Sequence, residues 1–162
     1  MELDCNGLEV LTSDECLRLL RSQTLGRIAL SSGALPVVLP VNFVVLDERI
    51  LIRTRNGTRL ARAAQNAVVA FEVDQFDAVT GEGWSVMVQG FARHVEGQPD
   101  LVFARDAPLA RWLDPRDSMH VEVSIDIVSG RRVQPDTERH TLDVEASSSD
   151  SPVGAVLDDG VR

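Results

Sequence analysis

Six segments with the composition of β-strands, joined by short turns, constrain the fold of this chain more than any other feature of its sequence. They lie at residues 26–30, 36–46, 50–53, 68–73, 84–95 and 121–133. The stretches between the first three, Ser31–Ala34 and Asp47–Glu48, have the composition of hairpin turns. Strands linked mainly by hairpins favour an antiparallel barrel over a parallel sheet, because a closed barrel leaves no exposed strand edges. The pattern predicts a mainly β protein, a six-stranded antiparallel barrel with short helices.

Helical patterns are confined to three places. Thr12 and Glu15 have the spacing of a capping box, which predicts a helix that ends near Gln23. A second short helix is expected after Gly57, which follows the third strand in the sequence. Residues 97–114 predict a third helical region, in two pieces.

Three strand segments carry further information. The run at 36–46 is apolar except for Asn42, which predicts a strand buried on both faces and an amide that must find partners there. In the segment at 84–95, Gly90 predicts a bulge or a close approach of two backbones. The alternation in the segment at 121–133 predicts one continuous last strand with a dry face and a wet face.

The composition changes sharply after Gln134. Residues 136–162 hold seven acidic residues against two arginines, include a run of three serines and contain no aromatic residue. This composition predicts a disordered acidic tail. We therefore divide the chain into a lead-in at 1–10, a barrel domain at 11–135 and a tail at 136–162.

Charge and residue usage exclude several classes of function. The net charge of −9 argues against binding to nucleic acid or to an acidic membrane surface. No apolar run approaches the ~20 residues of a membrane span, and the acidic N-terminus does not have the pattern of a signal peptide. We therefore expect a cytoplasmic protein with free thiols at Cys5 and Cys16. The chain has no lysine and no tyrosine, and its three histidines lack metal-ligand spacing, so no lysine Schiff base, tyrosine acid or metal site is predicted.

The stretch from Ile50 to Gln65 is basic within this acidic chain. Four of its residues are arginines, namely Arg53, Arg55, Arg59 and Arg62. A strand end, a glycine turn and a helix start offer free backbone N–H groups, and arginine adds forked donors that match phosphate oxygens. The pattern indicates a phosphate site, and the alternative is a solvated basic helix face.

Several short motifs stand in a recognisable order between residues 10 and 134. They are Gly26-Arg27-Ile28-Ala29, Pro40-Val41-Asn42-Phe43, Ile52-Arg53-Thr54 with Gly57-Thr58-Arg59-Leu60, Phe71-Glu72-Val73-Asp74, Gly83-Trp84-Ser85-Val86-Met87-Val88-Gln89-Gly90, and Ile127-Val128-Ser129-Gly130-Arg131. Their order and spacing resemble the pyridoxamine 5′-phosphate oxidase-like flavin-binding split-barrel family, in its smaller single-domain bacterial branch.

The resemblance implies a homodimer of split barrels that binds FMN at the dimer interface. The residues that match the phosphate-binding segment of the family are Arg53, Thr54, Thr58 and Arg59. The residues expected beside the isoalloxazine ring are Pro40, Val41 and Asn42. A further strand is expected to reach the cofactor, either within one subunit or from the partner subunit. Its expected contact residues are Trp84, Ser85 and Gln89.

By the same resemblance, the expected activity is that of an FMN-dependent oxidoreductase, which transfers a hydride to or from a small molecule. Such an enzyme needs no nucleophile–base pair, because the cofactor carries the hydride. The larger oxidases have an additional C-terminal segment for pyridoxine, with no counterpart here after Gln134, so oxidation of vitamin B6 is not implied. Two alternatives stay open: a non-catalytic dimer that holds flavin, haem or another cofactor as a store or sensor, and a deazaflavin in place of FMN. Arg27 either contacts the ligand or pairs with an acid.

Overall fold

The computed structural model describes residues 2–96 and 118–133. Its helices and strands, in chain order, are β1 (Glu9–Val10), α1 (Ser13–Ser22), β2 (Leu25–Ser32), β3 (Leu35–Leu46), β4 (Arg49–Arg55), α2 (Arg59–Ala63), β5 (Ala67–Phe76), β6 (Gly83–His94), β7 (Ser118–Ser124) and β8 (Ile127–Val133). The helical region predicted at 97–114 and the tail predicted at 136–162 lie outside the described residues. Within the described ranges no helix has the length and apolar character needed to cross a membrane.

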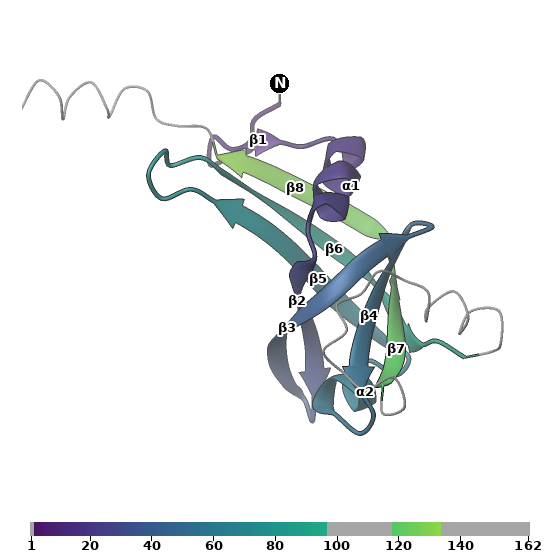
Figure 1. Cartoon of the computed structure of the whole chain (residues 1–162). Coiled ribbons are helices and arrows are strands. Elements are labelled where there is room, and N and C mark those ends of the chain that lie inside the picture. The colour runs from purple at the N-terminus through teal and green to yellow at the C-terminus, as the bar shows by residue number, and fades with distance from the viewer. Residues whose placement is uncertain (1, 97–117, 134–162) are drawn as a thin grey trace, which may run out of the picture.

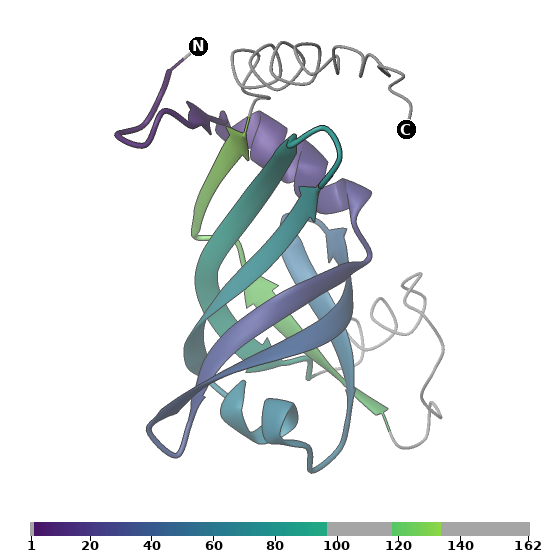
Figure 2. The ribbon, with the colours of Figure 1, turned by 90° about the vertical axis from the view of Figure 1, so that its left-hand side faces the viewer.

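The strands close into the predicted six-stranded antiparallel barrel (Figures 1 and 2). Around the ring the order is β6, β5, β2, β3, β4 and β7, and pairing between β7 and β6 completes the circle. β8 continues the chain beyond β7 and pairs with the other half of β6, and β1 lies against β8. The expectation of a mainly β split barrel is thus confirmed.

The core fills the barrel because alternate side chains of each strand point inward. Ile28, Phe71, Val86 and Val88 are each fully buried there. Phe71 packs edge-on against Phe43, with 4.7 Å between the ring centroids. The strands thus meet around one shared hydrophobic core.

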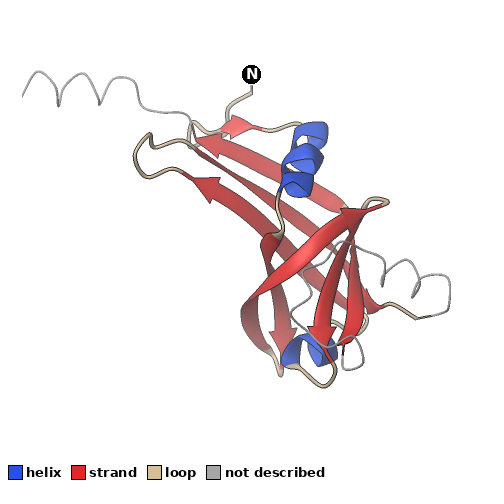
Figure 3. Ribbon diagram, in the orientation of Figure 1, coloured by secondary structure: helices blue, strands red, loops and turns tan. Residues whose placement is uncertain are grey.

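Two helices cover the ends of this arrangement (Figure 3). α1 places Cys16, Leu19 and Leu20 against β8, β3 and β6. α2 lies at the other end of the barrel, where Leu60 and Ala61 are buried. Burial raises the pKa of the Cys16 thiol, which keeps this group neutral in the core.

The prediction of one continuous strand over 121–133 is wrong, because the chain bends between β7 and β8. At the bend Gly90 of β6 passes so close to Ser124 that a Cβ atom on Gly90 would lie 1.7 Å from the Ser124 carbonyl oxygen. The Phe91 amide donates to Ser124 Oγ at 2.9 Å, and the Asp126 amide donates to the Gln89 carbonyl at 3.2 Å. Gly90 therefore makes the close approach predicted from its sequence, and that approach divides the last strand.

The loop between the strands predicted at 68–73 and 84–95 is shorter than the gap between those segments. β5 extends to Phe76, and the reversal occupies residues 77–82. Asp77 holds it: its amide donates to the Glu82 carbonyl at 2.8 Å, and its carboxylate accepts from the Val79 amide at 2.8 Å. Asp74 and its neighbours consequently belong to the sheet.

The prediction that the segment at 36–46 is buried on both faces is also wrong within one chain. Val41 and Phe43 point into the core, but Val38 on the opposite face is 61% exposed. On this face Pro36, Val38 and Pro40 are exposed, whereas Val44 and Leu46 pack against Leu51 and Val95.

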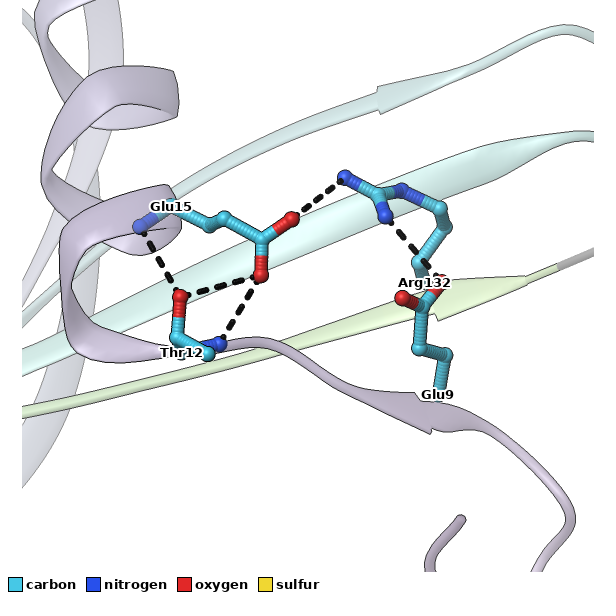
Figure 4. Close-up of polar contacts among 4 residues, drawn as sticks. All are labelled: Glu9, Thr12, Glu15 and Arg132. Carbon is cyan, nitrogen blue, oxygen red and sulfur yellow. Dashed lines mark hydrogen bonds and ion pairs between the residues drawn. The ribbon is translucent and has the colours of Figure 1, made fainter. Parts of the chain in front are cut away.

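Thr12 begins α1 with the predicted capping box (Figure 4). Thr12 Oγ1 accepts from the Glu15 amide at 3.3 Å, and Glu15 Oε2 accepts from the Thr12 amide at 3.1 Å. Arg132 of β8 lies 3.8 Å from the same carboxylate and also pairs with Glu9 at 3.0 Å. The helix start, β1 and β8 are thus joined through one arginine.

We expect Gly90→Ala to lower the free energy of unfolding by ~3 kcal/mol or more, because the added methyl group has to displace the Ser124 backbone. Gly81→Asn is the control, since Gly81 has open space around it and a positive φ that asparagine tolerates. Urea unfolding followed by tryptophan fluorescence measures both variants. Equal stability of Gly90→Ala and the native chain would contradict the role assigned to the close approach.

We expect Thr12→Val to lower the free energy of unfolding by ~1 kcal/mol, the usual effect of losing an N-cap oxygen. Thr12→Ser should change it little, because serine keeps the hydroxyl. The hydrogen bond from the Thr12 amide holds the pKa of Glu15 below its ordinary value of 4.5. The corresponding stabilisation is present above that value and is lost as the pH falls through the lower pKa of the folded state. Denaturant unfolding between pH 7 and pH 3 measures both the loss of stability in Thr12→Val and the pH at which the contribution of Glu15 disappears.

Candidate functional site

Four arginines surround the turn from β4 to α2, as the basic stretch predicts. Arg53 is half-buried on β4, and Arg55, Arg59 and Arg62 are exposed. None of the ion pairs among the described residues involves any of the four, whereas Arg27, for example, pairs with acids. The sequence from residue 49 to residue 71 contains no acidic residue. This concentration of positive charge, which has no acidic partner among the described residues, suits an anionic ligand.

Thr54 and Thr58 lie together, but their hydroxyl protons are already used within the protein. Thr58 Oγ1 accepts from the Ala61 amide at 3.1 Å and donates to the Arg55 carbonyl at 3.0 Å. Because a hydroxyl has one proton, Thr54 Oγ1 must donate to Thr58 Oγ1 across the 3.0 Å between them. Thr54 is also buried, pointing into the barrel. In this arrangement the two threonines shape the turn, and a phosphate would need one of these bonds to be exchanged.

Arg53 points the opposite way from Thr54, to the outside of the barrel. Its Nε donates to Nε2 of the buried His120 at 3.2 Å, which requires that this ring nitrogen carry no proton. The last pair between β3 and β4 is Phe43 with Ile52, so Asn42 and Arg53 follow one step further, both on the outward side. The structure thus brings Arg53 toward the residues expected beside the ring.

Of those residues, Pro40 and Asn42 lie on the outward side of β3, where Pro40 is exposed and Asn42 is half-buried. Val41 between them is buried and belongs to the core. Its side chain therefore cannot meet a ligand outside the barrel, and only its backbone can.

The residues expected on the other strand divide in the same way. Ser85 and Gln89 are exposed on the outward side of β6, and Trp84 is half-buried on the inward side. All outward residues of β3, β2, β5 and β6 form one surface, which we call the outer face. One row of this face, read from the strand register, contains Gln89, Ala70, Ala29 and Val38.

Within one chain the two groups of expected ring residues do not meet. Pro40 on β3 is separated from β6 by β2 and β5. Three strand spacings amount to about 14 Å. A planar ring that packs against Pro40 and Asn42 is therefore out of reach of Ser85 and Gln89 of the same chain.

An ion network occupies the space between the two groups. Arg27 Nη1 lies 3.0 Å from Glu72 Oε2 and 2.5 Å from Asp74 Oδ1. The bond to Asp74 raises the pKa of Arg27, and burial raises the pKa of Glu72. Of the two roles open to Arg27, the structure gives it acidic partners.

The rest of the outer face is largely apolar. Val68 is 78% exposed and lies directly opposite Phe91, which is 42% exposed. Further exposed apolar side chains on this side of the sheet are Leu25, Val38, Met87 and Ile127. Exposed apolar side chains gathered on one side of a sheet are typical of a face that meets a partner.

A cleft of about 190 Å³ lies beside Trp84 and Ser85, at the base of the hairpin between β5 and β6. Phe76 and Arg131 also line it. Arg131 is held by Asp4, whose Oδ2 accepts from Nε at 2.8 Å, and this bond lowers the pKa of Asp4. The sequence analysis did not identify Phe76 or Arg131 as a site residue, although Arg131 ends one of the motifs quoted above.

Comparisons with known proteins agree with this architecture. The family described as pyridoxamine 5′-phosphate oxidase matches residues 12–132. The uncharacterized protein Rv0080 of Mycobacterium tuberculosis is 35% identical over 132 residues, which are 78% of this chain and 86% of that protein.

Two solved structures are similar over most of the described chain. The FAD binding protein from Mycobacterium smegmatis is 39% identical with a TM-score of 0.69, covering 78% of this chain and 100% of that one. A conserved protein of unknown function from Corynebacterium diphtheriae is 30% identical with a TM-score of 0.66, covering 76% and 96%. The barrel, the ordered motifs and the family match lead to one conclusion: this chain belongs to the pyridoxamine 5′-phosphate oxidase family.

Proposed function

We propose that this protein is a flavin-dependent oxidoreductase that works as a homodimer and transfers a hydride to or from a small molecule. The observation that carries the proposal is the 39% identity with an FAD binding protein whose whole length this chain covers. FMN and FAD share the phosphate on the ribityl chain, so the basic stretch fits either one. The basic stretch offers donors for that shared phosphate, and we propose FMN as the cofactor because the family resemblance implies it.

The phosphate would lie against the guanidinium groups of Arg53 and Arg59, near the turn that Thr54 and Thr58 shape. Support comes from the absence of acidic partners for these arginines among the described residues. Each charge-assisted bond to a phosphate oxygen stabilises more than a neutral hydrogen bond.

The ring would pack outside the barrel near Pro40 and Asn42, with Ser85 and Gln89 supplied by a second copy. The separation of about 14 Å between these groups within one chain supports this assignment. So does the apolar outer face, which association would cover. The amide of Asn42 can both donate and accept, and therefore suits polar atoms at the edge of a ring.

The protein residues would bind and orient, while a bound flavin supplies the capacity to accept or donate a hydride. Val38, Phe91 and their apolar neighbours on the outer face would exclude water once covered by the partner. The cleft beside Trp84 offers room for a small molecule next to an aromatic wall. Turnover is tested by anaerobic reduction of the loaded protein with nicotinamide nucleotides, and a cofactor that binds but is never reduced would favour a storage or sensor role.

We expect Arg59→Gln to weaken FMN binding by ~1.5–3 kcal/mol, because it removes a charged donor from the proposed phosphate contact. Arg62→Gln is the matched control, since both arginines are exposed on α2. Fluorescence titration with FMN, FAD and riboflavin measures the effect. Riboflavin has no phosphate, so its affinity should be the same in both variants, and an equal loss for riboflavin would place the phosphate elsewhere.

We expect Val68→Asp to shift the protein from dimer to monomer and to weaken flavin binding at least tenfold, because it places a charge in the apolar outer face. Val79→Asp is the control: Val79 is 92% exposed but lies in the hairpin loop, away from the outer face. Sedimentation equilibrium with and without FMN reports the oligomeric state. A Val68→Asp protein that stays dimeric would exclude the outer face as the interface.

A further inference from the structure

We infer that His94 is a positioning residue for the proposed phosphate contact, acting through α2. This inference rests on the proposed function, since it concerns the turn that carries Arg59. His94 is the last residue of β6, more than thirty positions beyond α2 in the chain, and it is half-buried. Its ring contacts α2.

The contact between the two elements is a single short hydrogen bond. His94 Nε2 lies 2.6 Å from the carbonyl oxygen of Ala61. A carbonyl only accepts, so Nε2 carries the proton and donates it. In a longer helix the Ala61 carbonyl would accept from the amide of residue 65, but α2 ends at Ala63. His94 therefore satisfies a carbonyl that the helix itself leaves open.

The helix needs this support because it cannot hold its own position well. α2 has five residues, far fewer than the length at which a helix is stable alone. The side chains that it buries, Leu60 and Ala61, include only one large apolar group. Packing thus fixes α2 weakly, and polar contacts with the barrel have correspondingly more influence.

Two polar contacts tie α2 to the barrel from different sides. On one side, Thr58 is the N-cap of α2 and shares a hydrogen bond with Thr54 of β4. On the other side, His94 of β6 holds the carbonyl of Ala61. Arg59 lies between these two attachment points in the sequence. Losing the His94 bond leaves Thr58 as the remaining one of these two polar contacts, beside the burial of Leu60 and Ala61, and lets α2 tilt and shift Arg59 relative to Arg53.

Preorganisation links this geometry to affinity. When a binding group must be ordered by the ligand, part of the binding free energy is spent on ordering it. Only the phosphate meets Arg59 in the proposed arrangement. A loosened α2 should consequently weaken binding of FMN while leaving binding of riboflavin unchanged.

The test compares three substitutions of one residue in the full-length protein. His94→Gln places an amide N–H at about the same reach as Nε2, His94→Asn keeps an amide that is too short, and His94→Leu keeps bulk without a donor. The affinities for FMN and riboflavin are measured by fluorescence titration, and thermal melting of each protein without flavin reports its stability.

We expect the ratio of riboflavin to FMN dissociation constants to fall by about tenfold in His94→Asn and His94→Leu, and to be largely retained in His94→Gln. An equal loss for both ligands, or a ratio that is unchanged in all three variants, would overturn the positioning role. If the native chain itself binds FMN and riboflavin equally, the proposed phosphate contact fails, and the role of His94 fails with it. His94→Asn keeps the test valid if His94→Leu does not fold.

Discussion

The close passage of Gly90 past the Ser124 backbone is the constraint on which the rest of the barrel depends. It lets the C-terminal end of β6 pair with β7 and the longer N-terminal part of β6 pair with β8. The first pairing closes the ring, and the second extends β6 beyond it, where β1 and α1 dock on β8. A side chain at this position would force the two strands apart and remove both consequences together.

Much of the fold could be predicted because its signals are local. The capping box at Thr12, the hairpin turns and the alternation along β6 each follow from neighbouring residues. The errors came from longer-range geometry. The division of the last strand depends on a contact between Gly90 and Ser124, which alternation within 121–133 does not reveal. The outward side of β3 has the apolar composition of a buried strand, yet Pro36, Val38 and Pro40 on that side are exposed.

For the candidate site, the sequence indicated which residues lie near the phosphate and the ring, but not in which direction their side chains point. The family resemblance implied that Arg53 and Thr54 belong to one phosphate site, but strand geometry sends their side chains to opposite sides of β4. Val41 faces the core for the same reason. Adjacent residues in a strand cannot share a face, so a motif matched as a run of letters overstates its number of side-chain contacts. The sequence also could not show that the Thr58 hydroxyl is already hydrogen-bonded, because its partners, the Arg55 carbonyl and the Ala61 amide, are brought to it only by the fold.

The ion network of Arg27, Glu72 and Asp74 has a consequence for how selectively this protein associates. It stands among the exposed apolar side chains of the outer face, so any molecule that covers that surface must also take these charges out of water. A partner without complementary polar groups would leave them poorly solvated, and the resulting penalty opposes indiscriminate adhesion. The same charges also keep this part of the sheet hydrated when no other molecule lies on it.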